Sequence, residues 1–70
     1  MSSEEKKNIN HAIIERGKII SADNGAYIIR SFDRDGIESL PLRPLNEQAV
    51  FVVGESVCYL CFHDGTGRIL

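Results

Sequence analysis

The chain has 70 residues, of which 43% are hydrophobic, and it carries a formal net charge of −2. A chain of this length forms one domain at most and buries only about 60% of its unfolded surface. That leaves little room for both a core and an enclosed active-site cavity, so the chain length disfavours a cleft enzyme. The hydrophobic fraction disfavours general disorder.

Residues 1–11 are predicted to form a poorly ordered tail or a short helix. Ser2 and Glu5 stand at the spacing of a capping box, but isolated helices of this length are marginal in water. The segment is too charged for a signal peptide, and no apolar run approaches the ~20 residues that cross a bilayer. We therefore expect a soluble, cytoplasmic protein whose folded domain spans residues 12–70.

The first half of that domain is predicted to be a β-hairpin. Residues 12–22 form a long strand candidate with Gly17 in its middle, where a glycine allows a bulge or a sharp bend. Residues 23–25, Asp-Asn-Gly, are a strong hairpin turn. Residues 26–32 form the second strand, which ends in the Asp- and Gly-rich turn at 33–36.

The middle of the chain is predicted to hold two shorter strands. Residues 37–42 form the third, and Pro41 places it at a sheet edge because proline cannot donate to a ladder. Residues 45–48 form a loop or a single helical turn, and residues 49–53 form the fourth strand.

The closing hairpin carries the strongest strand signal. Residues 56–62 are rich in β-branched and aromatic residues, and the Asp-Gly-Thr-Gly turn at 64–67 leads to a short final strand at 68–70. Five or six short strands at nearly regular spacing, with no confident long helix, predict an all-β fold built as a small barrel.

The strand at 56–62 is apolar on both faces. Because side chains alternate along a strand, Val57, Tyr59 and Cys61 share one face and Cys58, Leu60 and Phe62 share the other. A barrel strand is normally polar outside, so one set needs cover. Either the N-terminal segment, with Ile9 and Ile13, covers the face formed by Cys58, Leu60 and Phe62, or a partner chain does, since exposed apolar patches are usually interaction sites.

No residue pattern predicts a metal site, a cofactor or a catalytic site. Cys58 and Cys61 spell C-x-x-C, but residues three apart on a strand point to opposite faces, so two buried, reduced cysteines are expected. Residues 33–38 lack the acidic spacing of a calcium loop, and His63 is interpreted as a surface histidine. The serines have no G-x-S-x-G context, and we expect neither an enzyme nor a small-molecule substrate.

A series of short motifs carries a family resemblance. In order, they are G-K-I-I at 17–20, G-A-Y-I at 25–28, G-I-E-S-L at 36–40, V-G-E-S-V at 53–57 and D-G-T-G-R-I-L at 64–70. Their order and spacing resemble the ribosomal S-one RNA-binding domain and bacterial translation initiation factor one. Both are OB-fold barrels of about this length, and the resemblance implies an OB-like barrel of five or six strands.

This resemblance implies a non-catalytic module that binds single-stranded RNA. In the family, the aromatic residue of the G-A-[FY]-V element faces outward and stacks on a base, a role that Tyr27 would take. Lys18, Arg30 and Arg43 would complete the binding surface. The charge count argues the other way, because five basic residues stand against seven acidic ones from Gly17 onward and phosphate contacts supply most of the affinity for nucleic acid.

A second resemblance covers the C-terminal half. The V-G-E-S-V motif followed by F-H-D-G-T-G-R-I-L is similar to OB-type modules of phage tail and baseplate proteins, which bind other proteins and need no basic face. It implies a structural or protein-interaction module of a phage tail or another assembly. On this alternative, Cys58, Leu60 and Phe62 form a protein interface or a homodimer contact.

Overall fold

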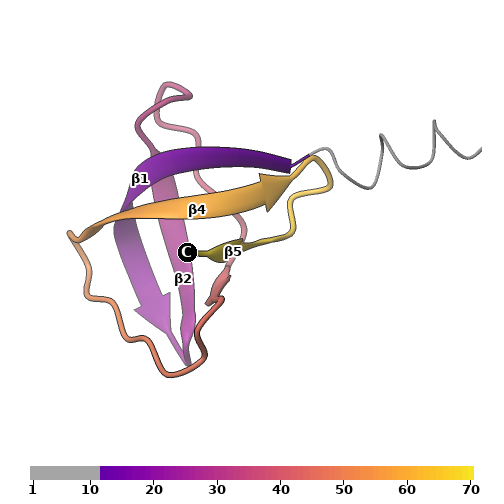
Figure 1. Cartoon of the computed structure of the whole chain (residues 1–70). Helices are drawn as coiled ribbons and strands as arrows, with labels where there is room; N and C mark the ends of the chain where they lie inside the picture. Colours follow the sequence, from indigo (N-terminus) through magenta and orange to yellow (C-terminus); the bar gives the residue numbers. More distant parts are fainter. Residues whose placement is uncertain (1–11) are drawn as a thin grey trace, which may run out of the picture.

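The protein forms one curled half-barrel sheet in the computed structural model, which describes residues 12–70 (Figure 1). The strands are β1 (Ala12–Asp23), β2 (Ala26–Ser31), β3 (Arg43–Pro44), β4 (Ser56–Phe62) and β5 (Gly67–Ile69). No helix occurs within these described residues, which confirms the all-β prediction for them. The predicted tail or helix at 1–11 lies outside the described residues, and so does any cover by Ile9. The predicted cover by Ile13 is wrong, because Ile13 belongs to β1 opposite Cys61, on the other side of the sheet from Cys58, Leu60 and Phe62.

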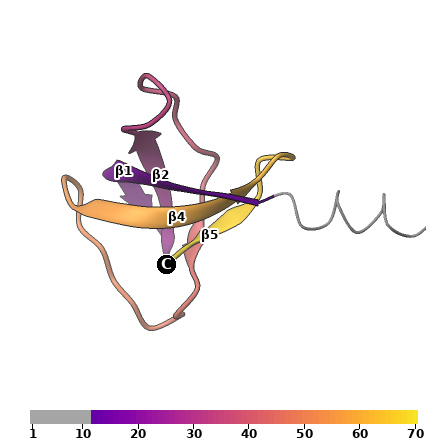
Figure 2. The same cartoon turned by 45° about the horizontal axis from the view of Figure 1, so that its top comes forward.

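The long strand β1 joins the two halves of the sheet. Its first half pairs antiparallel with β4 and its second half pairs antiparallel with β2, so the strand order is β2-β1-β4-β5-β3. β4 pairs antiparallel with β5, and β5 pairs parallel with β3. Figure 2 shows β4 and β5 crossing in front of the β1–β2 hairpin, so the sheet curls around an interior.

Gly17 lies where β1 passes from one partner strand to the other. It is paired with Val57 of β4 and with Ser31 of β2. A Cβ atom here would lie 2.5 Å from both the Arg30 carbonyl oxygen and Cγ2 of Ile29, so glycine permits a close approach of two strands. The register irregularity lies later, between Ile19 and Ser21, and a bulge at Gly17 itself is therefore not observed.

The β1–β2 turn confirms the hairpin prediction. Asn24 and Gly25 both have positive φ values, 54° and 78°. A two-residue hairpin turn with positive φ at both positions matches the right-handed twist of the flanking strands. This turn aligns β2 on β1 from Asp23 opposite Ala26 onward.

The predicted strand at 37–42 is wrong in extent. This segment contributes only two isolated bridges to β2, from Glu38 to Arg30 and from Leu42 to Tyr27, and regular pairing begins at β3. Pro41 lies between the bridges and has no N–H to donate, so the ladder is interrupted there.

The predicted strand at 49–53 is also wrong, because its backbone groups bond to side chains and within local turns instead of to a neighbouring strand. The Phe51 N–H donates to Oη of Tyr27 at 3.2 Å, and the Val52 N–H donates to Oε1 of Glu55 at 3.1 Å. The segment therefore crosses the open end of the sheet as an irregular connection, seen in orange at the bottom of Figure 1.

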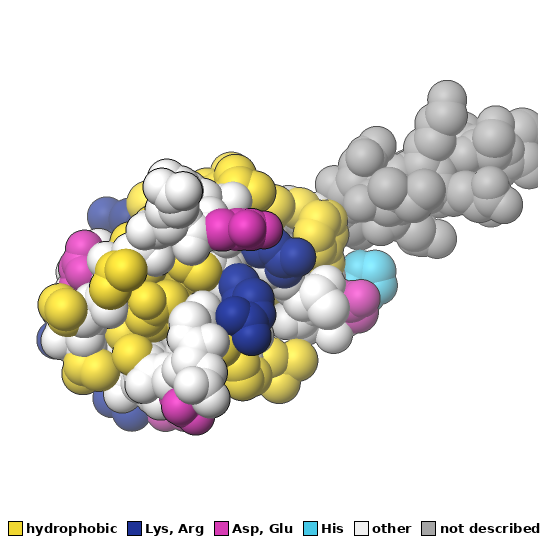
Figure 3. Space-filling view, turned by 90° about the horizontal axis from the view of Figure 1, so that it is seen from below, with side chains coloured by type: hydrophobic (Ala, Val, Ile, Leu, Met, Phe, Trp, Pro, Cys, Tyr) yellow, Lys and Arg dark blue, Asp and Glu magenta, His cyan; other side chains and the backbone are white. Residues whose placement is uncertain are grey.

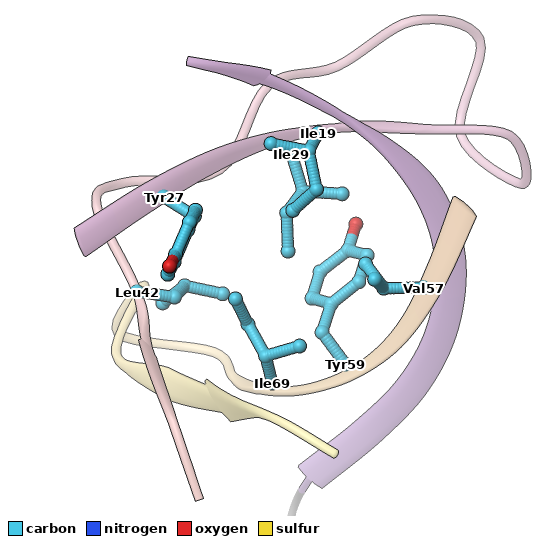
Figure 4. Packing of buried hydrophobic residues seen from close by; sticks show 7 residues of the cluster. All are labelled: Ile19, Tyr27, Ile29, Leu42, Val57, Tyr59 and Ile69. Carbon is cyan, nitrogen blue, oxygen red and sulfur yellow. The ribbon is translucent and has the colours of Figure 1, made fainter. Parts of the chain in front are cut away.

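The core fills the concave side of the sheet. Every strand, together with the bridge residue before β3, contributes to it or borders it, and Figure 4 shows the side chains converging from opposite walls. Its buried hydrophobic members are Ile19, Tyr27, Ile29, Leu42, Val57, Tyr59 and Ile69. Phe51 closes one end of the core by an edge-to-face contact with Tyr27, with ring centroids 5.5 Å apart.

Candidate protein-docking face

The outward side chains of β1 and β4 form one continuous surface. Residues directly opposite each other in an antiparallel pair project to the same side, and the register pairs Ala12 with Phe62 and Ile14 with Leu60. Tyr59, which precedes Leu60 and points to the opposite side, is buried in the core. The predicted division of β4 into an inner and an outer face is confirmed for Val57, Cys58 and Tyr59, whereas Leu60, Cys61 and Phe62 are all half-buried.

This surface is apolar and open to solvent. We define the docking face as Ile14, Phe32, Cys58, Leu60 and Phe62. Ile14 and Phe32 are 64% and 53% exposed, Cys58 is exposed, and Leu60 and Phe62 are half-buried. Phe32 belongs to it because its N–H bonds to the Arg16 carbonyl oxygen, which brings the end of β2 beside β1.

A shallow hollow borders the docking face and shares Phe32 and Cys58 with it. Its volume is about 280 Å³, and its lining residues are Arg16, Phe32, Ser56, Val57 and Cys58. Protein interfaces concentrate their binding energy where an anchoring side chain fills a desolvated pocket. A hollow with an aromatic wall and a cationic wall is suited to such an anchor.

Two cations lie along the β1 side of this surface. The outward positions of β1 include Arg16 and Lys18, and Ser56–Phe62 contains no acidic residue. Arg16 makes only a long contact, 3.8 Å, to the carboxylate of Asp33, and its side chain is 70% exposed. Asp33 is the acidic residue beside this surface, and its Oδ2 also accepts the Arg16 N–H at 3.0 Å, whereas Glu15 lies in the interior.

Tyr27 does not face outward, so the prediction that it is an exposed stacking residue is wrong. Its side chain is 5% exposed and belongs to the core, with its ring against Phe51 and its Oη accepting the Phe51 N–H. The alternation along β2 places Ile29 on the same inner side. In this structure the ring of Tyr27 presents no free face to a base.

The three cations predicted with Tyr27 are divided between two places. Lys18 and Arg30 are cross-strand neighbours on β1 and β2, and Arg30 donates to Oε2 of Glu38 at 3.0 Å. Arg43 lies on β3 instead, beside Arg68 of β5. The structure therefore does not bring the predicted nucleic-acid residues into one site.

A buried polar cluster lies behind the docking face. Glu15 is 4% exposed; its Oε1 accepts a 2.8 Å hydrogen bond from Tyr59, and its Oε2 lies 2.7 Å from Nε of Arg34. Burial and the hydrogen bond to Glu15 raise the pKa of Tyr59. Burial, the largest influence, would lower the pKa of Arg34, but the charge of Glu15 and the hydrogen bonds to Tyr59 and Glu15 together outweigh it, and the pKa is raised. The cluster is a satisfied ion pair that anchors the 32–36 turn to β1.

Sequence reasoning missed Ile14, Phe32 and Glu15. The alternation along residues 12–22 was the available signal for Ile14, because it places Ala12, Ile14 and Arg16 together. Phe32 could be assigned only once the end of β2 was known to lie beside β1. Nothing local distinguishes the buried Glu15 from a surface glutamate.

The two cysteines lie on opposite sides of β4, as their spacing predicted. Cys61 is half-buried against the core, whereas Cys58 is exposed, so the expectation that both are buried is wrong for Cys58. Both are free thiols. Within residues 12–70, no three His, Cys, Asp or Glu side chains gather in an arrangement able to hold a metal ion, and none of the described segments is a helix suited to crossing a membrane.

Comparison with known proteins gives no relative: no protein-family model, no curated protein and no solved structure matches this chain.

Proposed function

We propose that the curled sheet is an OB-type barrel that serves as a non-catalytic binding module. Two observations support the OB assignment. The bridges from Tyr27 to Leu42 and from Arg30 to Glu38 continue the sheet from β2 toward β3, and β3 then pairs parallel with β5. This gives the neighbour sequence β1-β2-β3-β5-β4-β1, which suits a partly open five-stranded barrel of the OB kind.

The ligand of this module is another protein, and the apolar docking face is the observation that supports this proposal. β4 is apolar on both sides, and among the described residues only its inner side is packed in the core. An apolar sheet face bordered by polar residues is the kind of surface that binds proteins. The half-buried Leu60 lies at its centre, opposite Ile14 of β1.

The charge of the docking face specifies the partner further. Arg16 and Lys18 lie along its β1 side, and β4 has no acidic residue. Asp33 pairs with Arg16, whereas Lys18 forms no ion pair within the described residues. Complementary potentials steer association and disfavour like-charged partners. The partner therefore presents an apolar surface with an acidic rim, as in an assembly in which this chain is a structural component.

Site-specific photo-crosslinking from Cys58 tests this proposal. A photoreactive thiol reagent is attached to Cys58 in a Cys61→Ser chain, and the control carries it at Asp35→Cys in a chain with both native cysteines replaced by Ser. In an extract of the cells that make the chain, a product is expected from Cys58 and not from the turn position. Its partner, identified and purified, is expected to bind more weakly as salt rises.

Leu60→Lys is the companion variant. It is expected to abolish the crosslink and to leave the fold intact, because an outward strand position tolerates a charge and a core position does not. Sedimentation of the wild-type chain alone decides between partner classes. A dimer that Leu60→Lys dissociates would replace the proposal with self-association, and a crosslink that survives Leu60→Lys would refute the assignment of the face.

Single-stranded nucleic acid is the second candidate ligand, and Phe32 favours it. This aromatic ring is 53% exposed and lies beside Arg16 on a surface that also carries Lys18. Aromatic rings that stack on bases, flanked by cations, are the usual elements of such sites. The mode of binding would differ from the one predicted, since Phe32 replaces Tyr27 as the stacking residue.

Titration with an oligonucleotide at low salt tests this second candidate. Phe32→Leu keeps the site apolar but removes the aromatic face, and a loss of roughly 1–3 kcal/mol of binding free energy is expected if a base stacks there. Lys18→Gln should lower the slope of log K against log salt by about 1. Amide signals around Phe32 that stay still at low salt would dismiss nucleic acid as the ligand.

A further inference from the structure

Arg43 of β3 and Arg68 of β5 are register partners in the parallel pair at the edge of the sheet. Both are exposed, and their chain neighbours Leu42, Gly67 and Ile69 are buried. The two side chains therefore project to the same outer side of neighbouring strands. Like charges at opposed positions of neighbouring strands are destabilising.

These two guanidinium groups lack the partners that other arginines of the described region possess. Arg16, Arg30 and Arg34 each form an ion pair with a carboxylate, whereas within residues 12–70 no carboxylate lies within ion-pair distance of Arg43 or Arg68. No ion pair within the described residues offsets the repulsion between their charges. An anion placed between them would relieve it.

Each guanidinium is held by one nitrogen and keeps its other donors available. Nη1 of Arg43 donates to the Asn24 carbonyl oxygen at 3.3 Å, and Nη1 of Arg68 donates to the Gly67 carbonyl oxygen at 2.8 Å. A guanidinium has five N–H donors. Gly25 leaves room for the Arg43 guanidinium, because a Cβ atom there would lie 3.2 Å from Nη1 of Arg43.

A surface cavity of about 390 Å³ opens at this pair of arginines. Its lining residues are Gly25, Arg43, Pro44, Leu45, Glu47, Ala49 and Arg68. The volume falls within the range of small-molecule sites. The face seen from below shows neighbouring lysine or arginine side chains with hydrophobic and acidic side chains beside them (Figure 3).

We propose that this cavity binds a phosphate monoester that carries a small apolar group. The phosphate lies between Arg43 and Arg68, since planar guanidinium groups bind phosphate oxygens in pairs. Leu45 and Ala49 contact the apolar part of the ligand. Glu47, on the same cavity, repels a second negative group and so disfavours polyanions. This site is separate from the docking face, and Arg43 takes no part in that face.

Amide NMR titration tests the site with three probes: inorganic phosphate, phenyl phosphate, and a single-stranded oligonucleotide without terminal phosphates, each against sodium chloride at equal ionic strength. Phenyl phosphate is expected to bind most tightly and to shift the amides of Gly25, Leu45 and Ala49. Tighter binding of the oligonucleotide would assign the arginine pair to the backbone of a nucleic acid and overturn the monoester proposal. Shifts that sodium chloride reproduces would show ionic screening only.

Three variants locate the binding. Arg43→Gln is expected to weaken phenyl phosphate binding at least about tenfold, because a hydrogen bond to a charged group contributes roughly 1.5–3 kcal/mol. Glu47→Gln is expected to strengthen it by removing repulsion. Arg30→Gln, which replaces an arginine outside the cavity, is the matched control and should leave it unchanged. Thermal unfolding confirms that each variant is folded, and equal weakening by Arg43→Gln and Arg30→Gln would refute the site.

Discussion

The hydroxyl of Tyr59 donates a 2.8 Å hydrogen bond to Oε1 of Glu15, and the two residues are also direct partners in the β1–β4 register. The bond therefore lies inside the sheet, on the inner side of the strand pair whose outer side is the docking face. Arg34 contacts the other carboxylate oxygen from the 32–36 turn, at 2.7 Å. Three distant parts of the chain meet at one buried carboxylate, which makes this cluster the most sensitive polar feature of the fold.

Arg34→Met is expected to destabilise the protein more than Glu15→Gln. Removing the cation leaves a buried carboxylate without its counter-charge, which costs several kcal/mol in a fully buried pair; because Arg34 is 43% exposed, we expect about 2 kcal/mol. Glu15→Gln keeps an acceptor for Tyr59 and leaves an arginine that water can solvate. Urea unfolding measures the loss of stability in both variants. Arg30→Met, which removes the exposed ion pair with Glu38, is the control and is expected to cost under about 1 kcal/mol. Equal losses from the two cluster variants would mean that the carboxylate is solvated.

Stability is expected to fall with rising pH in a way that depends on Tyr59. Its pKa is raised in the folded state, chiefly by burial, so above pH ~10 the unfolded chain loses this proton while the folded chain still holds it. The unfolded state then binds fewer protons, and the free energy of unfolding declines by up to about 1.4 kcal/mol per pH unit until the folded-state pKa is passed. Urea unfolding across pH 8 to 12 measures this decline.

Tyr59→Phe removes the contribution of this group, so its stability should decline less steeply over that range. Tyr27→Phe, which leaves Tyr59 in place, is the matched control. Identical pH profiles for Tyr59→Phe and the wild-type chain would contradict the burial of the Tyr59 hydroxyl.

Tyr27→Ala is expected to unfold the protein or come close to it. Truncating a buried aromatic residue costs roughly 3–5 kcal/mol, which is comparable to the whole stability expected of a domain of this size. Tyr27→Phe keeps the ring against Phe51 and loses only the bond to its N–H, so it should cost about 1 kcal/mol. Circular dichroism with urea unfolding distinguishes the two. Wild-type stability in the alanine variant would place the ring outside the core and restore the original stacking hypothesis.

Cys58 is expected to react with a thiol reagent faster than Cys61. The first thiol is exposed on the docking face and the second is packed against the core, where it donates to the Phe62 carbonyl oxygen. Accessibility controls thiol reactivity together with pKa. Rates for Cys58→Ser and Cys61→Ser chains, each retaining one thiol, measure the difference. Protection of Cys58 in the isolated wild-type chain would show that something already covers the docking face.

Local chemistry was sufficient to predict the hairpins and the closing strand. Asn24 and Gly25 adopt positive φ values with little strain, so the turn between β1 and β2 is determined by two residues. The β-branched and aromatic run at 56–62 became β4 with the same bounds. The grouping of Val57 with Tyr59 and their separation from Cys58 followed from alternation alone, because side chains on a strand have a fixed period of two.

Only the tertiary structure decided which face of β2 is inside and which segments pair. Alternation groups Tyr27 with Ile29 but does not say which side of that strand is covered, and the curl of the sheet places both in the core. The segment 49–53 has strand-like composition, yet the fold offers it Oη of Tyr27 and the Glu55 carboxylate instead of a neighbouring strand. Burial and hydrogen bonding are properties of groups that the fold brings together. Phe51 and Tyr27 are 24 positions apart, so no local sequence pattern predicts their contact.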